Sequence, residues 1–378
     1  MKQTEEYMNL SIDTPTDVQE VLFTDEFPGD FLERYDKVLL VVDSRASDNQ
    51  RVRNHISSVK VAFLSKTCQT ITLDINNRVK NTHSMLSLLD IMEQLGMTRR
   101  SLVIGIGGGS IGDLVGVTAS IYMRGIDYCL IPTTYISMVD GVISKVALNH
   151  GHSKNLVGMF TSPKLAIVDT QIAKVDDRKT IAYGIVEMWK HALIVNNKSI
   201  INEIDQALDK EHQYTHEELK KWAYWSMKTK MEFVNNDWYD RDNIHKALSL
   251  GHTLANVYET RCNIHHAEAV TYGIIFEAIV ANRAKILSDK KLESTLKVAS
   301  KLEIFFNVFN QVQKEITLAM IIRVLKSDKI NHSNTFNLVL PIDDGYCVKE
   351  IDDQLMSDSL SDYLNLHFNE KQNRFSNN

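Results

Sequence analysis

The hydrophobic pattern of the chain changes about halfway along its length. In the first half, short apolar runs alternate with helix-like stretches such as Ser84–Leu95, and Lys37–Asp43 is almost continuously apolar, which is typical of a strand buried on both faces. Further predicted strands are Val61–Leu64, Gln69–Leu73, Ser101–Ile106, Tyr128–Ile131 and Leu165–Val168. The alternation predicts an α/β domain with a doubly wound parallel sheet over residues 1–178.

The second half, residues 179–378, has helical periodicity and no proline before Pro341. The pattern predicts helices over Ile181–Asn196, Glu217–Asn236, Ala247–Thr260 and Ala267–Leu287. A short β-like segment, Phe336–Leu340, follows, and we expect the polar tail Asn369–Asn378 to fray. We therefore predict an all-α C-terminal domain.

Composition narrows the class of protein. A hydrophobic fraction of 44% and a charged fraction of 24% are typical of a globular domain, and the net charge of -6 argues against nucleic acid or an anionic membrane as partner. No apolar run is long enough to span a bilayer, and the polar start Met1–Glu6 does not resemble a signal peptide. The four cysteines are scattered, as is usual for free thiols, so we expect a cytoplasmic protein.

A glycine-rich turn lies between a predicted strand and a predicted helix. It runs from Gly107 to Asp113, after Ser101–Ile106 and before the helix-like run Leu114–Ser120. Backbone N–H groups at such a turn and at the helix N-terminus attract phosphate, and the missing Cβ atoms let a pyrophosphate approach. The same pattern also occurs in plain strand–helix connections, so the turn alone leaves both interpretations open.

Three residues of the second half could bind a metal ion. Glu187, His252 and His266 lie in separate helical segments, and two imidazoles with one carboxylate suit zinc with one position left open. Taken singly, each has an ordinary interpretation as a solvated, capping or core residue. Lys190 lies one turn after Glu187, where a simple ion pair is the alternative, and Lys230 by itself is an ordinary lysine on a helix surface.

A polar stretch follows the glycine turn. Its cations suit a phosphate, and its carboxylate and amides suit sugar hydroxyls, although a polar loop with chance charges is the alternative. These residues are Arg124, Thr133, Thr134, Asp140, Lys145, Asn149, Lys154 and Asn155.

Seven motifs in this order resemble those of the sugar-phosphate cyclases, the family that includes 3-dehydroquinate synthase. They are Gly107–Asp113, Tyr122–Gly125, Ile131–Thr134, Ser153–Gly158, Glu187–Lys190, Leu250–Thr253 and His266–Val270. Asn76–Lys80 is a weaker match, in which Lys80 is kept and Asn77 stands in place of a glutamate. The resemblance implies a dehydroquinate synthase-like fold with a Rossmann-like N-terminal domain, and an enzyme that uses NAD and Zn²⁺ or Co²⁺ on a small phosphorylated sugar.

The resemblance also implies roles for single residues. The metal ligands would be Glu187, His252 and His266. The NAD site would comprise Asp43, Lys80, Gly107, Gly108, Gly109, Asp113, Thr133 and Thr134, together with Asp140, Lys145 and Lys154. The catalytic and substrate-binding residues would be Asp140, Lys145, Lys190, Lys230, Arg124, Lys154 and Asn155. In this family the arginine often reaches the phosphate from a neighbouring subunit, so we expect a homodimer.

The implied reaction is a phosphate elimination by a carbon–oxygen lyase. NAD oxidises a secondary alcohol, the resulting ketone makes the adjacent C–H acidic, and phosphate leaves; the hydride then returns and an aldol step closes a carbocycle. NAD is therefore recycled rather than consumed.

Several substrate-facing positions depart from the 3-dehydroquinate synthase pattern. His245 replaces an arginine expected to hold a carboxylate, and a neutral imidazole does not replace that bidentate contact. The other departures are Ser249, Asn256 and Ile330.

These departures favour a cyclase with an altered substrate, for example glucose 6-phosphate or sedoheptulose 7-phosphate. A standard 3-dehydroquinate synthase, a 2-deoxy-scyllo-inosose synthase and a heptulose 7-phosphate cyclase such as 2-epi-5-epi-valiolone synthase stay open. More distant alternatives are a glycerol dehydrogenase-type polyol dehydrogenase and a non-catalytic pseudoenzyme.

Overall fold

The computed structural model describes residues 9–14, 18–63, 67–74, 79–143, 145–151, 153–210, 213–242, 244–327 and 336–368. The chain forms two compact units: unit 1 comprises residues 1–176 and 214–239, and unit 2 comprises residues 177–213 and 240–378. This division differs from the predicted one in the segment 214–239, which contains helix α9 (His216–Asn236). That helix packs within unit 1, where the hydroxyl of Tyr135 donates to the carbonyl of Leu219 at 3.1 Å.

Unit 1 is built on a seven-stranded sheet with the strand order β1-β2-β9-β6-β5-β3-β4. All neighbouring strands are parallel except β1 and β2, which are antiparallel. The strands are β1 (Asn9–Asp13), β2 (Val18–Leu22), β3 (Lys37–Asp43), β4 (Thr67–Leu73), β5 (Leu102–Gly107), β6 (Asp127–Pro132) and β9 (Leu165–Ile167). The structure thus confirms the predicted α/β class.

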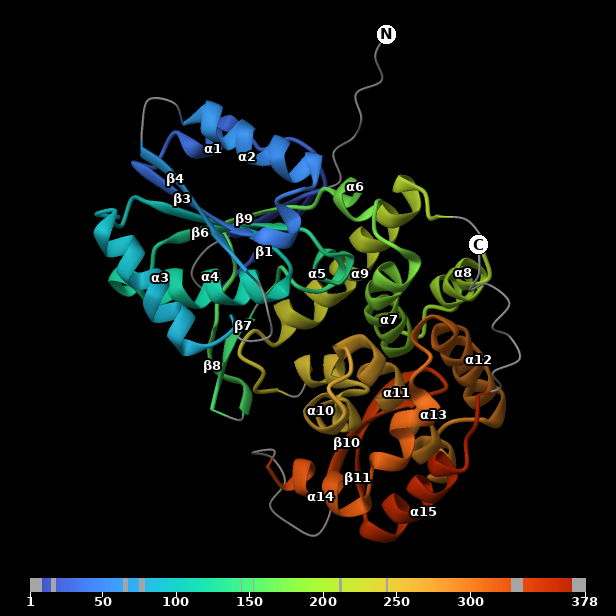
Figure 1. Ribbon diagram of the computed structural model, residues 1–378. Coiled ribbons are helices and arrows are strands. Elements are labelled where there is room, and N and C mark those ends of the chain that lie inside the picture. The colour runs from blue at the N-terminus through green and yellow to red at the C-terminus, as the bar shows by residue number, and fades with distance from the viewer. Residues whose placement is uncertain are drawn as a thin grey trace. The chain divides into compact units, whose positions relative to one another are not determined.

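Helices cover both faces of this sheet. Figure 1 shows α1 (Gly29–Leu32) and α2 (Gln50–Ala62) over one face, and α3 (Thr82–Gln94) and α4 (Gly109–Ile121) over the other. Every residue of β5 is consequently buried, which explains its nearly continuous apolar sequence. Three further helices and a separate antiparallel hairpin complete the unit: α5 (Tyr135–Val139), α6 (Thr170–Ala173), α9, and β7 (Lys145–His150) with β8 (Ser153–Phe160).

The predicted strand Val61–Leu64 is wrong. Residues up to Ala62 belong to α2, and Leu64 lies outside the described residues. The side chain of Asn49 caps the start of α2, and Val52 and Val59 are buried seven residues apart on one face. Helical spacing of the buried positions thus outweighs the local β preference of this short apolar run.

The strand order reverses direction between β3 and β5. The chain leaves β3 through α2 toward the sheet edge at β4, whereas it leaves β5 through α4 toward β6 on the other side. The carboxyl ends of β3 and β5, at Asp43 and Gly107, are therefore neighbours at a topological switch point. Open α/β sheets bind ligands at such points.

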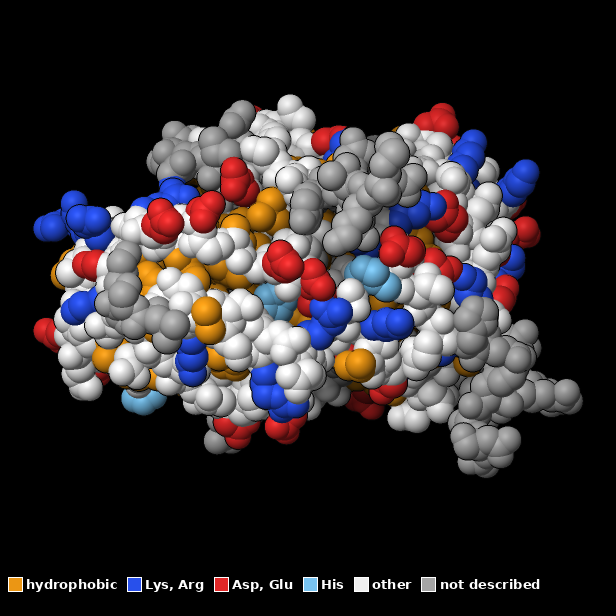
Figure 2. Space-filling model, turned by 90° about the horizontal axis from the view of Figure 1, so that it is seen from above, with side chains coloured by type: hydrophobic (Ala, Val, Ile, Leu, Met, Phe, Trp, Pro, Cys, Tyr) orange, Lys and Arg blue, Asp and Glu red, His pale blue; other side chains and the backbone are white. Residues whose placement is uncertain are grey.

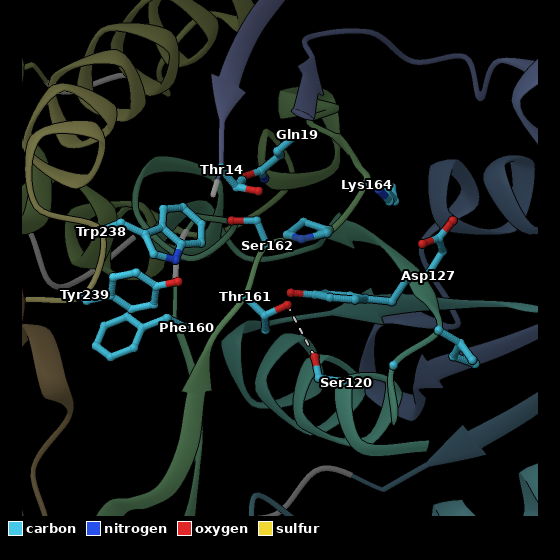
Figure 3. A pocket seen from close by; sticks show the side chains of 14 residues that line it. Thr14, Gln19, Ser120, Asp127, Phe160, Thr161, Ser162, Lys164, Trp238 and Tyr239 are labelled. Atoms are coloured by element: carbon cyan, nitrogen blue, oxygen red, sulfur yellow. Dashed lines mark hydrogen bonds between the residues drawn. The ribbon is translucent and has the colours of Figure 1, made fainter. Parts of the chain in front are cut away.

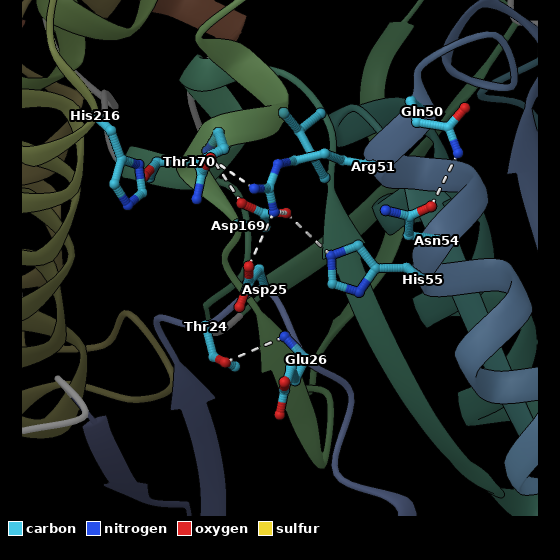
Figure 4. A network of polar contacts seen from close by, with 12 residues as sticks. Thr24, Asp25, Glu26, Gln50, Arg51, Asn54, His55, Asp169, Thr170 and His216 are labelled. Carbon is cyan, nitrogen blue, oxygen red and sulfur yellow. Dashed lines mark hydrogen bonds and ion pairs between the residues drawn. The ribbon is translucent and has the colours of Figure 1, made fainter. Parts of the chain in front are cut away.

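A polar network lies at another part of the carboxyl edge of the sheet in unit 1 (Figure 4). Arg51 on α2 lies between Asp25 and Asp169, at 3.1 and 3.2 Å, and His55 Nε2 lies 3.2 Å from the same Asp169 carboxylate. His55 and Asp169 are both buried, so their pairing offsets the cost of removing polar groups from water. We interpret the network as a structural tie between α2 and the segment that follows β9.

Unit 2 is mainly helical and is centred on α11 (His266–Arg283), in which all residues from Ala267 to Ala281 are buried. Around it are α7 (Arg178–Ile194), α8 (Lys198–Leu208), α10 (His252–Arg261), α12 (Asp289–Phe306), α13 (Phe309–Val312), α14 (Leu318–Ser327) and α15 (Asp353–Leu364). The prediction of an all-α domain needs one correction, because β10 (Phe336–Ile342) pairs with β11 (Gly345–Ile351) in an antiparallel hairpin.

The predicted continuous helix Ala247–Thr260 is also wrong. A 3-10 helix, His245–Ser249, ends before Gly251, which has a φ of 84°, and α10 then begins at His252. A residue in the left-handed region interrupts an α-helix, and glycine adopts that conformation without a steric cost. The polar tail predicted to fray, Asn369–Asn378, lies outside the described residues.

Two surface observations bear on partners. Among the described residues, no helix combines the length and the apolar character that crossing a membrane requires. On the face drawn in Figure 2, the Lys and Arg side chains of the described residues are interspersed with Asp and Glu side chains. The described residues of that face therefore form no continuous basic surface of the kind that binds nucleic acid.

Candidate functional site

The glycine turn of unit 1 leaves space at the N-terminus of α4. A Cβ on Gly107 would lie 2.6 Å from Ile111 Cγ1, and one on Gly108 would lie 3.1 Å from Thr134 Cγ2, whereas one on Gly109 would meet nothing within 4 Å. The first two glycines thus allow close packing. Gly109 is the first residue of α4, and the first N–H groups of a helix have no intrahelical partners and attract an anion.

Other predicted NAD-site residues surround this turn. Asp43 lies at the end of β3, and its Cβ is 3.2 Å from the position of a Cβ on Gly107. Thr133 donates its backbone N–H to the carbonyl of Gly107 at 2.9 Å, and Thr134 is the N-cap of α5. The ends of strands that are far apart in the sequence therefore meet at the switch point. The glycines and the threonines at this point fit a pyrophosphate.

Lys80, Asp113 and Asn155 form a second cluster in unit 1. Lys80 Nζ lies 2.6 Å from Asp113 Oδ2 and donates to Asn155 Oδ1 at 2.6 Å. The other Asp113 oxygen accepts the backbone N–H of Ala147 on β7 at 3.0 Å. Both oxygens of Asp113 are thus engaged by the protein, and this carboxylate ties α4 to the β7–β8 hairpin.

Asp140 and Lys230 are paired within unit 1. Lys230 Nζ lies 3.1 Å from Asp140 Oδ1 and donates to the Asp140 carbonyl at 2.5 Å. Lys230 is only 7% exposed, so it is not the ordinary surface lysine that its sequence context alone indicated. A lysine is rarely buried without such a partner, which makes the pair a candidate for proton transfer or substrate contact.

Three of the predicted site residues, Lys145, Lys154 and Arg124, have exposed side chains. Lys145 and Lys154 are exposed at opposite ends of the β7–β8 hairpin, about 13 Å apart at the usual rise per residue. Arg124 is exposed beyond the C-terminal end of α4, a helix of 13 residues and thus about 20 Å from the glycine turn. Within its own unit, Arg124 does not reach that turn.

The conformation around Arg124 is unusual. Met123, Arg124 and Gly125 have φ values of 49°, 68° and 110°. Arg99 donates two hydrogen bonds to the Met123 carbonyl, at 3.1 and 3.0 Å, and so holds this turn. Left-handed conformations are uncommon for residues other than glycine and occur often where function requires them.

Glu187, His252 and His266 converge within unit 2. Glu187 lies on α7, whereas the two histidines are the first residues of α10 and α11. His266 Nε2 is 3.5 Å from Glu187 Oε1, and the two imidazole centroids are 5.3 Å apart. Two ligand atoms that are each about 2.1 Å from a tetrahedral zinc ion lie about 3.4 Å apart, so the His266–Glu187 spacing fits such an ion.

Both imidazoles are oriented through their second nitrogen. His252 Nδ1 lies 3.2 Å from the Leu250 carbonyl, and His266 Nδ1 is hydrogen-bonded to the carboxylate of Glu259. Metal-binding histidines usually have such a partner, which leaves Nε2 available for the ion. Glu259 was not among the predicted residues, although its position seven residues after His252 places it on the same face of α10.

The electrostatics of the cluster differ between its two imidazoles. Burial, together with the nearby charges of Lys190 and His266, lowers the pKa of His252 to about 4, so this ring is neutral at pH 7. For His266, burial opposes the charged form, but hydrogen bonds with Glu187 and Glu259 raise its pKa to about 9. Lys190 Nζ also lies 2.5 Å from Glu187 Oε2. The neutral ring of His252 and the carboxylate of Glu187 have the chemistry of donors to a divalent metal.

The glutamate in the motif His266–Val270 fixes the start of α11. Glu268 accepts the backbone N–H of His265 at 2.9 Å and forms a capping box with it. The Tyr183 hydroxyl donates to Glu268 at 3.2 Å, and its ring stacks on His265 with centroids 3.6 Å apart. These contacts give His266 a fixed position at the first residue of the helix.

The positions that depart from the family pattern differ in exposure. His245 is buried, whereas Ser249 and Asn256 are exposed, and Asn256 lies one turn after His252 on α10. Ile330 lies outside the described residues, as do Asn76 and Asn77 of the weaker Lys80 motif.

Unit 1 also contains a cavity of about 290 Å³ (Figure 3). Aromatic side chains of Phe160, Trp238 and Tyr239 form one wall, and hydroxyl groups of Ser120 and Thr161 lie on another side. The cavity adjoins the residues that precede β6 and β9, so it lies at the amino edge of the sheet. The glycine turn is at the carboxyl edge, and the cavity is therefore separate from the predicted site.

Comparison with known proteins supports the motif-based interpretation. Residues 70–182 match the family model for the 3-dehydroquinate synthase N-terminal domain, and residues 184–331 match the model for its C-terminal domain. A 3-dehydroquinate synthase of Oceanobacillus iheyensis is 34% identical over 282 residues, which cover 72% of this chain and 74% of the relative. The chain belongs to the 3-dehydroquinate synthase family of sugar-phosphate cyclases and is an enzyme of that family.

Solved structures share the fold. A 2-deoxy-scyllo-inosose synthase complexed with carbaglucose-6-phosphate, NAD⁺ and Co²⁺ superposes with a TM-score of 0.79 at 20% identity, covering 94% of this chain and 99% of that one. The 2-epi-5-epi-valiolone synthase of Streptomyces hygroscopicus, with NAD⁺ and Zn²⁺ bound, gives a TM-score of 0.77 at 18% identity, covering 97% and 99%. These likenesses establish the dehydroquinate synthase-like fold.

Proposed function

We propose that this chain is a NAD- and metal-dependent sugar-phosphate cyclase that eliminates phosphate and forms a carbocycle. The convergence of Glu187, His252 and His266 carries the proposal, because each imidazole is held through Nδ1 and the distance of 3.5 Å between His266 Nε2 and Glu187 Oε1 fits a divalent ion. Similar structures contain Co²⁺ or Zn²⁺ together with NAD⁺. When bound here, the metal would polarise a substrate oxygen, and NAD would accept and return a hydride.

The chain itself supplies binding, orientation and charge. The space beside Gly109 and the N-terminus of α4 suit the pyrophosphate of NAD. Buried Lys190, next to Glu187, and buried Lys230, next to Asp140, suit the recognition of substrate oxygens and the transfer of protons. We assign Lys145, Lys154 and Asn155 to the substrate region on their motif positions.

We propose a substrate other than the one used by standard 3-dehydroquinate synthases. Position 245 carries an imidazole, which lacks the two parallel donors with which an arginine binds a carboxylate. A phosphorylated sugar without a carboxylate, such as glucose 6-phosphate or sedoheptulose 7-phosphate, suits this site better. A standard 3-dehydroquinate synthase is the second candidate, favoured by curated relatives of that name at 34% and 30% identity.

We also propose a homodimer in which Arg124 serves the neighbouring subunit. Arg124 is exposed, is held in a left-handed turn and lies about 20 Å from the glycine turn of its own unit. An arginine that binds phosphate needs to touch the substrate, and this position suits delivery to a second copy of the chain.

The deciding experiment measures phosphate release and NADH together. Purified enzyme with added Co²⁺ or Zn²⁺ is given each of a panel of phosphorylated sugars and ulosonates. We expect phosphate release at NAD concentrations far below that of the substrate, without net NADH, and a carbocyclic product. Steady accumulation of NADH would instead identify a polyol dehydrogenase. Metal and NAD binding without turnover of any panel member would favour a non-catalytic protein.

A further inference from the structure

Glu277 lies on α11, eleven residues after His266, and is fully buried. It belongs to none of the motifs described above. Its Oε2 accepts the backbone N–H of Gly251 at 2.5 Å, and Thr253 donates to the same carboxylate from its backbone and its hydroxyl. Glu277 thus binds the two residues that flank His252.

The backbone at this point lies directly on α11. A Cβ on Gly273, one turn before Glu277, would lie 1.7 Å from the carbonyl oxygen of Gly251. A Cβ on Gly251 would in turn lie 2.7 Å from the carbonyl oxygen of Val270. Glycine at both positions lets the start of α10 approach α11 closely, and that approach brings Gly251 within reach of Glu277.

Glu277 acts as a cap from a neighbouring helix. The first N–H groups of a helix have no intrahelical partners, and the N-cap of α10 is Gly251, which has no side chain to satisfy them. A buried N–H without an acceptor is costly, so the Glu277 oxygen that accepts the Gly251 N–H stabilises this end of the helix. Glu277 on α11 therefore supplies an acceptor that the N-cap residue of α10 does not have in its own side chain.

We propose that Glu277 is a positioning residue for the metal centre, acting by fixing the backbone on both sides of His252. This inference rests on the proposed function, because it assumes that His252 binds the metal. The hydrogen bonds hold the His252 backbone, and the contact of Nδ1 with the Leu250 carbonyl sets the orientation of the ring. The length of the Glu277 side chain, rather than its charge, is the property that positions His252.

Two substitutions separate the effect of side-chain length at position 277 from the effect of charge. E277D keeps the carboxylate but shortens the side chain by one methylene, and E277Q keeps the length and one acceptor oxygen. Metal-free protein is titrated with Co²⁺, whose visible absorption reports both affinity and ligand geometry. We expect E277D to weaken Co²⁺ binding about tenfold and to change the spectrum, as loss of an outer partner of a metal ligand does. We expect E277Q to stay within about threefold of the unaltered chain.

Glu303 on α12 provides the matched control. It is also buried, and it accepts the Phe309 N–H at 2.7 Å and the Tyr272 hydroxyl at 2.6 Å, but neither bond involves α10. We expect E303D to lower the melting temperature without changing the affinity for Co²⁺ or the spectrum. Equal losses of affinity in E303D and E277D would mean general destabilisation and would overturn the proposal.

Other outcomes are equally decisive. Parental affinity and spectrum in E277D would show that the contact does not position His252. If E277D does not fold, Thr253→Val removes one donor only; we expect about threefold weaker binding, and unchanged binding would overturn the proposal. If the unaltered chain itself binds no Co²⁺, the metal site of the proposed function is wrong. Binding by the unaltered chain with no response to Glu277 variants refutes this inference alone.

Discussion

The glycine turn of unit 1 and the histidine cluster of unit 2 form their proposed binding sites in opposite ways. The turn depends on atoms that are absent, since the missing Cβ atoms of Gly107 and Gly108 permit packing and that of Gly109 leaves room for a ligand. The histidine cluster depends on added support, since Glu259 and the Leu250 carbonyl orient the imidazoles.

This difference determines how each region should respond to mutation. In unit 1 the strand, turn and helix are contiguous in the sequence, so one backbone path forms most of the site. In unit 2 three helices have to meet, and the charged groups are buried, so removing one partner leaves another uncompensated. We expect side-chain losses in unit 2 to have larger effects than side-chain additions in unit 1.

The largest expected effect is that of Glu187→Gln. It removes the only carboxylate among the proposed ligands and leaves buried Lys190 without its anionic partner. We expect phosphate release to fall about 1000-fold, equivalent to about 4 kcal/mol, together with a loss of Co²⁺ binding. Glu303→Gln, in another buried carboxylate of unit 2, is expected to keep both properties. Parental turnover by E187Q would exclude this metal site.

Arg124→Ala is expected to lower activity about 100-fold by removing a charge-assisted contact with the phosphate. Mixing R124A with E187Q, under conditions that exchange subunits, tests the origin of the arginine. If Arg124 serves the neighbouring subunit, random mixing restores about a quarter of the parental activity, because half of the dimers then contain one intact site. No recovery, although mixed dimers are present, would place the arginine in its own subunit.

Two glycine substitutions test the turn. We expect G109A to weaken NAD⁺ binding about tenfold while the melting temperature stays nearly constant, because the added methyl enters the space proposed for the pyrophosphate. We expect G107A to lose about 1–3 kcal/mol of stability instead, because its methyl would meet Ile111 at 2.6 Å. Calorimetric titration and thermal unfolding measure the two effects; parental NAD⁺ affinity in G109A would contradict the proposed site.

The smallest expected effect concerns pH. Burial, opposed by bonds from Gly251 and Thr253, raises the pKa of Glu277 to about 8, above its ordinary value of 4.5. Its contribution to stability is therefore present below pH 4.5 and is lost as the pH rises toward 8. We expect the melting temperature of metal-free protein to fall between pH 6 and pH 8.5, and E277Q to reduce that fall. Identical slopes in both proteins would argue against this titration.

The sequence predicts the structure best where the signal is local. The strand, turn and helix around Gly107–Asp113 follow from contiguous residues, and the structure brings Asp43 and Thr134 to the same point. The prediction failed at Val61–Leu64, where the spacing of buried residues in α2 overrides an apolar run. It also failed at Gly251, where contact with another helix decides the conformation and ends the predicted continuous helix.

The sequence by itself determined the family, the α/β and helical halves, and the identities of the residues proposed as ligands, because motif order and hydrophobic period are properties of the chain alone. The tertiary structure decided which polar groups are buried and what holds them. Lys230 became a buried partner of Asp140, and Glu259 and Glu277 became supports of the histidines. Such roles depend on distances between helices, and the free energy of a charged group depends on the neighbours that replace its water.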